Sequence, residues 1–343
     1  MASLAPAASS RALLPVVVAI GVLTALGAAT LGAAAVTAPG SAPTVLGLGV
    51  TCWLLGARHA LDADHIAAID NTTRRLLDRS DGDSTGTADA GRPRAATTGF
   101  WFALGHSTVV FAAVVLITAG VAVLRDQLAD DGSPLGRFTG VWGPLVSSAF
   151  LLLIAVLNLR MLAATRRALG TDGDRVPAPA GGPLTRLFAA PLRRIDTPRA
   201  MYPVGLLFGL GFDTATTIGL IVIAAGSAAL LPAWAALALP VVFAAGMTLV
   251  DTLDAVLMER AYGWALRDRR RRLTYNTVVT GVSILAAVGV AAVTLAALGT
   301  ELLGDVPVLG RLAAVDLQYA GVALVGFFAV AFAVTLLRTR TPT

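Results

Sequence analysis

The chain of 343 residues contains no lysine, one cysteine and three histidines. All 26 basic residues are therefore arginine, which excludes chemistry that needs a lysine amine, such as a Walker A nucleotide site or a Schiff base. An ATP-driven pump within this chain is thus not expected. The single cysteine, Cys52, excludes an internal disulfide framework, and we expect it to be a small buried apolar residue.

Charged residues are also scarce, at 14% of the chain, whereas a typical soluble domain carries about 25%. Hydrophobic residues make up 56%. This balance predicts a membrane protein. The net charge of +5 does not indicate a nucleic-acid partner, because the arginines lie in short segments between apolar runs.

The apolar runs are long enough to cross a bilayer as helices, which takes roughly 20 residues each. The first run is longer than the apolar core of a secretory signal peptide, so we count it as a span. The sequence predicts an all-α integral membrane bundle of about eight transmembrane helices, at about 12–37, 43–69, 98–124, 140–164, 201–226, 233–258, 275–299 and 317–337.

Arginine placement predicts the orientation of the bundle. Most arginines lie in 71–97, 165–200 and 259–274, and positive residues favour the cytoplasmic side. Both termini are therefore expected to be cytoplasmic, in a multi-pass protein of the cytoplasmic membrane. We interpret 1–343 as a single membrane domain, with 71–97 and 165–200 as flexible cytoplasmic loops, because these two are polar and rich in Gly, Pro and Ser.

Several polar residues nevertheless fall inside the predicted spans. An ionised side chain at mid-bilayer costs roughly 2.5–3.5 kcal/mol on insertion scales, so these groups must be paired, hydrated or neutralised. Five carboxylates against one arginine leave a negative excess that a bound cation would correct. The residues are His59, His65 and His106, with Arg58, Asp62, Asp64, Asp213, Asp251 and Asp254.

These residues are expected at a similar depth, in the inner half of the membrane or, for Asp213, near the middle of its span. At about 100° per residue along the helix of span two, His59, Asp62 and His65 fall within an arc of about 120°, and Asp64 points to the other side. Asp251 and Asp254 are one turn apart and share a face. Imidazole nitrogen suits nickel, cobalt, copper, zinc and iron(II), whereas calcium and magnesium prefer oxygen ligands.

The residues alone leave other interpretations open. Arg58 and Asp62 would also suit a structural ion pair, and Asp213 with its threonine neighbours would suit an interhelical hydrogen-bond cluster. Asp251 and Asp254 would also serve as charge partners of Arg58. A membrane metalloenzyme is a further alternative, but three histidines are few for a histidine-box oxidase.

Four motifs, in order along the chain, resemble those of the nickel/cobalt transporter family (NiCoT), which are secondary permeases of eight spans. The family's H-x4-D-H signature matches His59, Asp64 and His65, and its GHS element matches the segment around His106. LGFDTATT, with Asp213, matches LGxDTATE, except that Thr217 replaces the glutamate. The fourth match is GMTLVDTLD, which contains Asp251 and Asp254.

The resemblance implies a permease and not an enzyme, moving Ni²⁺ or Co²⁺ by alternating access, with uptake as the expected direction. The metal is the transported substrate, and no resident cofactor is expected. The expected partners are the metal ion and the lipid bilayer; nothing indicates an oligomeric state. An exporter of divalent metals is the alternative. The expected ligands are His59 and His65, supported by Asp62 and Asp64, with His106, Asp213, Asp251 and Asp254 along the path.

Overall fold

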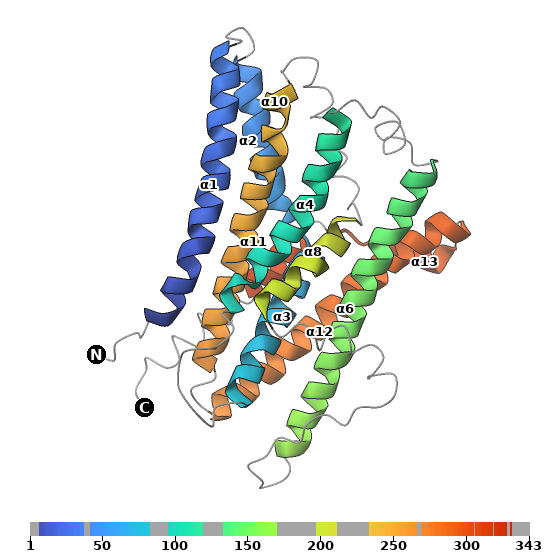
Figure 1. The fold of residues 1–343 in the computed structure, drawn as a ribbon. Helices are drawn as coiled ribbons and strands as arrows, with labels where there is room; N and C mark the ends of the chain where they lie inside the picture. Colours follow the sequence, from blue (N-terminus) through green and yellow to red (C-terminus); the bar gives the residue numbers. More distant parts are fainter. Residues whose placement is uncertain are drawn as a thin grey trace. The chain divides into compact units, whose positions relative to one another are not determined.

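A computed structural model describes the greater part of the chain, and every regular element in the described part is a helix (Figure 1). No strand occurs in these residues, which confirms the prediction of an all-α membrane protein. The described residues are 7–37, 42–82, 95–118, 133–169, 197–210, 233–265, 269–304, 306–317, 319–327 and 330.

Five described helices are long and apolar enough to cross a membrane. A sixth span is counted if two helices that are separated by a short break are taken together as one crossing. Their positions match five of the predicted spans. The predicted spans at 201–226 and 317–337 lie partly outside the described residues, so the total of eight stays a prediction. The five segments are Leu13–Thr37, Ala95–Leu116, Gly140–Arg160, Ala238–Arg260 and Thr280–Leu303.

The chain folds into two compact units, each assembled from three separate stretches. Unit 1 comprises Met1–Leu61, Ala96–Val146 and Arg199–Leu253, and unit 2 comprises the remainder. Unit 1 contains α1 (Ala7–Thr37), α2 (Ala42–His59), α4 (Thr98–Thr118), α8 (Met201–Gly209), α10 (Ala233–Ala236) and the first part of α11 (Ala238–Ala265), up to Leu253. Unit 2 contains α3 (Ala63–Gly82), most of α6 (Pro134–Leu169), α12 (Arg269–Leu303) and α13 (Pro307–Ala313).

Within unit 1, α4 and α8 pack backbone against backbone. A Cβ atom on Gly105 would overlap the carbonyl oxygen of Tyr202, and one on Gly205 would overlap the carbonyl oxygen of Phe102. Small residues at both sides of a contact let two membrane helices approach closely. These two glycine contacts therefore fix the position of α4 at Gly105. They thereby also place the next residue, His106.

Helix α11 makes the same kind of contact with two other helices of unit 1. Gly56 in α2 lies against the carbonyl of Phe243, and Gly246 in α11 lies against the backbone of α2. Gly99 in α4 lies against the carbonyl of Asp251. Helix α11 thus holds both α2 and α4 at short range. An apolar cluster packs around these contacts and includes Cys52, which is fully buried, as expected.

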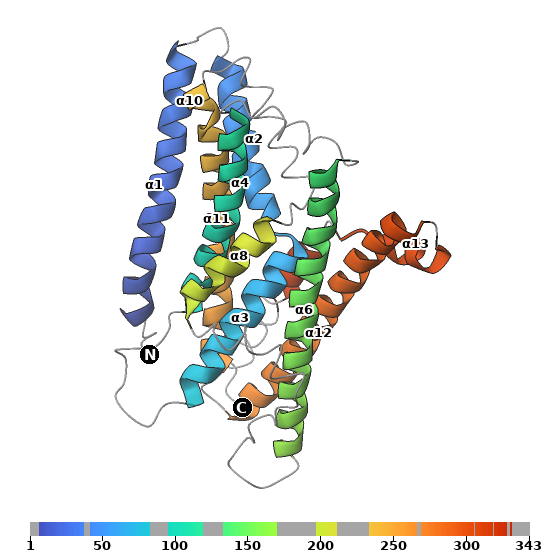
Figure 2. The ribbon, with the colours of Figure 1, turned by 45° about the vertical axis from the view of Figure 1, so that its right-hand side comes forward.

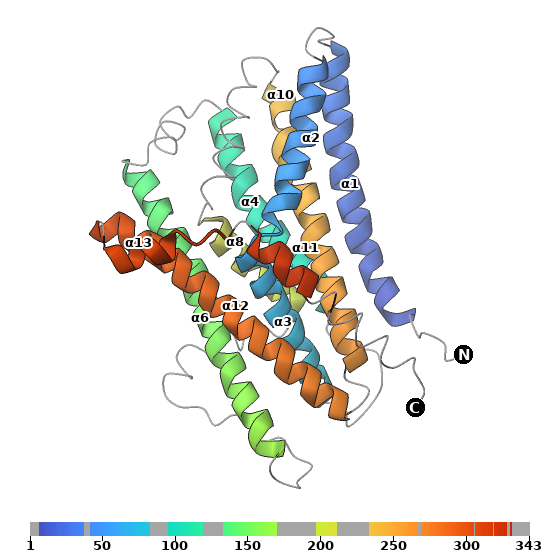
Figure 3. The same cartoon turned by 180° about the vertical axis from the view of Figure 1, so that it is seen from behind.

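Within unit 2, α3 packs against α6 and α12 through small apolar side chains (Figures 2 and 3). Ala63 and Ala67 on α3 belong to one buried cluster with Leu151 on α6 and with Ala287 and Val290 on α12. The small side chains bring the three helices close together. Helix α3 also buries Ile66, Ile69 and Leu76, but it carries more polar residues than the apolar segments of the other spans.

The prediction of one continuous helix over 43–69 is wrong, because α2 ends at His59 and α3 begins at Ala63. The carbonyl of Asp62 accepts the first hydrogen bond of α3, from the backbone N–H of Ile66. The carboxylate of Asp64 accepts the N–H of His65 at 2.9 Å. Carboxylates are favoured at a helix N-terminus, where backbone N–H groups lack partners. The arc calculated for a single helix therefore does not apply.

Helix α3 also extends beyond the predicted end of the span. It continues to Gly82, so 71–82, which the sequence analysis assigned to a flexible loop, is helical. Helix α6 likewise continues to Leu169, into the second predicted loop. The remainder of the two predicted loops lies mostly outside the described residues.

We predict that Gly205→Ala lowers the apparent unfolding temperature of the purified protein by several degrees, because the new methyl group meets the backbone of α4. Overpacking of this kind costs about 1–3 kcal/mol. Gly21→Ala in α1 is the matched control, because nothing lies within 4 Å of the added carbon. An unchanged unfolding temperature for Gly205→Ala would contradict the close packing of α4 and α8.

Candidate metal centre

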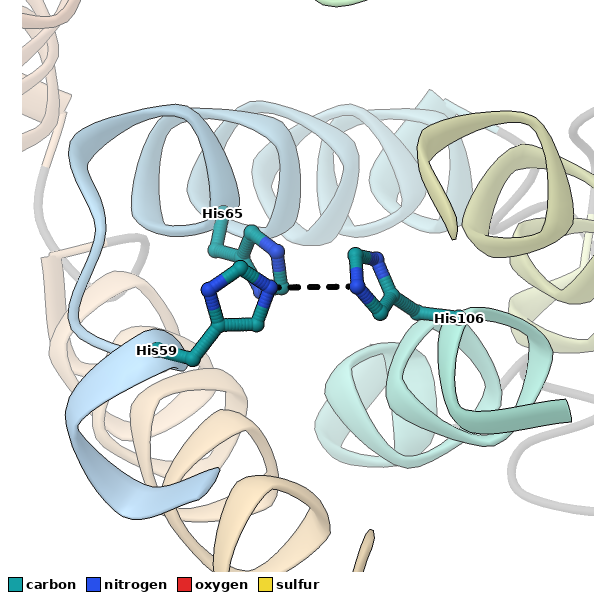
Figure 4. Close-up of side chains that lie close together, drawn as sticks. All are labelled: His59, His65 and His106. Atoms are coloured by element: carbon teal, nitrogen blue, oxygen red, sulfur yellow. Dashed lines mark hydrogen bonds between the residues drawn. The ribbon is translucent and has the colours of Figure 1, made fainter. Parts of the chain in front are cut away.

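Two buried histidines of unit 1 lie in direct contact. His59 is the last residue of α2, and His106 lies in α4. Their Nε2 atoms are 3.1 Å apart and their ring centroids 4.9 Å apart, as Figure 4 shows. Both side chains are almost wholly buried. The last turn of α2 and the glycine contacts of α4 together aim the two imidazoles at one point.

The contact between the two Nε2 atoms is a hydrogen bond, so one ring must carry a proton there and the other must offer a lone pair. A metal ion would replace that proton and use both lone pairs. With metal–nitrogen bonds of about 2.0–2.1 Å, two nitrogens are about 2.9 Å apart at 90° and about 3.4 Å apart at the tetrahedral angle. The observed 3.1 Å lies between these two values. The pair is therefore spaced for one ion.

Aromatic side chains enclose the two imidazoles within unit 1. The ring of Phe243 on α11 is 6.0 Å from that of His59, and the ring of Phe102 is 6.4 Å from that of His106. Phe208 on α8 meets Phe102 edge to face. These rings exclude water, which strengthens charge interactions at the imidazoles. The C-terminal end of α2, where His59 lies, carries a negative partial charge that favours a cation.

His65 belongs to unit 2 and occupies the first turn of α3. Its side chain is buried, and its backbone N–H donates a hydrogen bond to the carboxylate of Asp64. Figure 4 draws its imidazole with those of His59 and His106, and each of the three residues offers one ring nitrogen as a metal ligand. All three histidines of the sequence therefore lie in the buried part of the described structure.

The carboxylates that the sequence analysis singled out occupy different environments. Asp62 and Asp64 are half-buried at the start of α3. Asp251 and Asp254 are buried on α11, while Leu253 between them is 57% exposed, so the two carboxylates share the inward face of that helix. Asp213 lies outside the described residues. Arg58, in contrast to its neighbour His59, has an exposed side chain.

A group of buried polar residues on α3 was not predicted from the sequence. Asp70, Asn71 and Arg74 are each at most 3% exposed, although the residues from position 71 onward were assigned to a loop. A signal was present, since no glycine or proline occurs from Ala63 to Asp81. An uninterrupted stretch of that length favours a helix over a loop.

Comparison with known proteins identifies the family. A statistical description of the high-affinity nickel-transport protein family, NicO, matches residues 45–338. The chain is 41% identical over 302 residues to the nickel transporter NicT of Mycobacterium tuberculosis, covering 85% of this chain and 78% of NicT. It is 33% identical to the nickel transporter NixA of Staphylococcus aureus, covering 85% of each.

A third relative is named for a different metal. The chain is 36% identical to the cobalt transport protein NhlF of Rhodococcus rhodochrous, covering 76% of this chain and 73% of NhlF. No solved structure matches the chain. The family match spans most of the sequence and includes both histidine-bearing helices of unit 1. The chain belongs to the NicO family of high-affinity nickel-transport proteins, and it is a membrane transporter rather than an enzyme.

Proposed function

We propose that this chain is a secondary permease that carries Ni²⁺ or Co²⁺ across the cytoplasmic membrane into the cell, and that His59, His65 and His106 bind the ion. The observation that carries the proposal is the buried contact between His59 and His106, whose nitrogens are spaced for one metal ion. The names of the relatives, two nickel transporters and one cobalt transporter, support the choice of metals.

We assign His65 as the third ligand because the chain itself keeps it near His59. Only Ala60, Leu61 and Asp62 separate the end of α2 from the start of α3, and His65 follows in the first turn. Three neutral imidazoles favour a borderline transition-metal ion over calcium or magnesium, which prefer oxygen ligands. A single ion bound in this way would join α2, α3 and α4.

The carboxylates have a supporting role in this proposal. A divalent ion brings two positive charges into a low-dielectric region, and a site of neutral imidazoles alone would not compensate them. Asp62 and Asp64 border the ligands in sequence, and Asp213, Asp251 and Asp254 belong to the other motifs of the family. We propose that they neutralise the ion along its path, as ligands or as partners that orient the imidazoles.

The break between α2 and α3 suits a transport site. Discontinuous helices recur at the binding sites of secondary transporters, because their free carbonyl ends attract cations and the break acts as a flexible joint. Inward movement of a dication gains about 4.6 kcal/mol per 100 mV of membrane potential, which corresponds to roughly a thousandfold accumulation. The potential alone is therefore sufficient to drive uptake.

We predict that His59→Ala, His65→Ala and His106→Ala each weaken Ni²⁺ binding by at least about 100-fold, because loss of a ligand costs at least as much as loss of a residue that supports one. Titration calorimetry of purified protein measures the affinity, and uptake of radioactive nickel by expressing cells measures transport. Thr30→Val in α1 is the control, because the exposed Thr30 hydroxyl donates to the carbonyl of Leu26 within its own helix.

One result would overturn the ligand assignment, and another would overturn the proposed direction of transport. One is wild-type affinity in any of the three histidine variants at normal folding and expression. The other is nickel loss from preloaded cells without any uptake, which would indicate an exporter with the same site.

We predict that Ni²⁺ binding weakens as the pH falls through about 6.5, the ordinary pKa of imidazole, because each ligand must give up its proton before it binds the metal. Protons and the metal ion compete for the same imidazole lone pair. Acid favours the protonated ring, which has no lone pair for the ion, so the affinity falls as the pH falls. Affinity measured from pH 5 to pH 8 should rise with pH and then level off. A flat profile would indicate oxygen ligands in place of the histidines.

We predict that Thr217→Glu tightens metal binding or changes the ratio of nickel to cobalt uptake. Thr217 lies outside the described residues, four positions after Asp213, and it replaces the glutamate of the related motif. A carboxylate about 6 Å from a dication contributes roughly 5 kcal/mol at an effective dielectric of 20, before the cost of burial is subtracted. A remainder of about 1.4 kcal/mol would change the affinity tenfold.

The measurement is competitive uptake of the two metals by wild type and variant at equal expression. Thr217→Gln is the matched control, because it adds a side chain of the same size without the charge. If both variants have the wild-type affinity and metal ratio, position 217 lies away from the path of the ion.

A further inference from the structure

Five successive polar residues of α3, slightly more than one turn, are all buried. They are Asp70, Asn71, Thr72, Thr73 and Arg74, each at most 3% exposed. Successive residues of a helix point about 100° apart, so this run covers every face of the turn. Polar groups buried in a membrane protein require hydrogen-bond partners, because each unsatisfied group costs several kcal/mol.

Asn71 is the centre of the resulting network. Its side-chain oxygen accepts a hydrogen bond from Nη2 of Arg74 at 2.6 Å and another from the amide of Asn158 on α6. Its own amide nitrogen donates to the carbonyl of Ala67 at 2.6 Å. Because a guanidinium only donates and a carbonyl only accepts, these partners determine the orientation of the Asn71 side chain.

Two further bonds join α3 to α12. Nη1 of Arg74 donates to the hydroxyl of Thr280 at 2.7 Å. The hydroxyl of Ser283 donates to the carboxylate of Asp70 at 2.8 Å. The residue order on α3 is opposite to that on α12, so the two helices run antiparallel and are linked at two successive turns. All of these residues belong to unit 2.

These hydrogen bonds fix the register of α3 relative to its neighbours, which its apolar contacts do not. Ala63 and Ala67 pack against α6 and α12 through methyl groups, and such contacts have no preferred direction. Hydrogen bonds are directional and weaken steeply when misaligned. A slip of α3 by one residue would shift it by about 1.5 Å and rotate it by about 100°, and the guanidinium of Arg74 would then lose its partners. Buried polar groups set the register of paired helices in the same way in coiled coils.

We propose that Asn71 and Arg74 are positioning residues for transport: through Asn158 and Thr280 they lock α3 in one register and so hold His65, in the first turn of the same helix, in place to bind the metal. The proposal rests on the assignment of His65 as a ligand. Apolar packing alone would not place α3 with the precision that a metal site needs. His65 can act as a ligand only if its ring lies within a fraction of an ångström of the correct position.

The test is Thr280→Val, which removes the acceptor of Arg74 with almost no change in volume. We expect the Ni²⁺ affinity of the purified protein to fall about tenfold, the low end of the range for direct hydrogen-bond partners of a metal ligand, because Thr280 acts on His65 only through α3. Thr280→Ser, which keeps the hydroxyl, should restore the affinity. Thr300→Val is the matched control on the same helix, because the Thr300 hydroxyl donates to the carbonyl of Ala297 within α12.

A double variant separates positioning from general stability. If Thr280 acts through His65, Thr280→Val should cause no further loss of affinity in a protein that already carries His65→Ala. The same substitution should still cause its loss in a protein with His106→Ala. Equal, additive losses in both backgrounds, or a lowered unfolding temperature with unchanged affinity, would overturn the positioning role.

A second substitution keeps the test decisive if Thr280→Val does not fold. Asn158→Leu removes a donor to Asn71 from the α6 side and has a similar volume, and it should lower the affinity with the same dependence on His65. Failure of the inference is distinct from failure of the proposed function. In the first case His65→Ala weakens binding while the α6 and α12 variants do not, and in the second His65→Ala itself has no effect.

Discussion

Polar groups can lie inside a bilayer only when their hydrogen-bonding atoms are satisfied, and this requirement governs both units of the protein. In unit 1, two imidazoles share one proton between facing nitrogens and are enclosed by aromatic rings. In unit 2, a guanidinium is bound by an amide oxygen and a hydroxyl. The first arrangement has a proton that a metal ion can replace. In the second, Nη1 and Nη2 of Arg74 each donate to an acceptor, and the bonds serve to hold a helix.

Close helix packing makes the histidine pair possible. The Nε2 atoms of His59 and His106 meet because α2 and α4 each approach α11 at glycines, and α4 also approaches α8 at Gly105 and Gly205. The contacts are between backbones, so they tolerate little adjustment, in contrast to contacts between flexible side chains. A metal ligand on such a helix is held by the fold itself, as preorganised binding requires.

The sequence was sufficient to predict the helical membrane fold, the positions of five spans and the histidines as the chemically distinct residues. It was not sufficient to predict the break after His59, because a run of mostly apolar residues gives no clear signal that a helix ends there. Asp62 and Asp64 carried that information, since carboxylates are common where a helix begins. The contact between His59 and His106 depends on distances between helices, which follow from tertiary packing and not from spacing along one chain.

X-ray absorption spectroscopy of the purified protein loaded with one equivalent of Ni²⁺ tests whether three imidazoles bind the transported ion. Scattering from the outer ring atoms counts the imidazole ligands, and the first shell gives the metal–nitrogen distance. We expect three imidazoles in the wild type, at about 2.0–2.1 Å, and two in His65→Ala. A first shell of oxygen atoms alone, or the same imidazole count in both proteins, would contradict it.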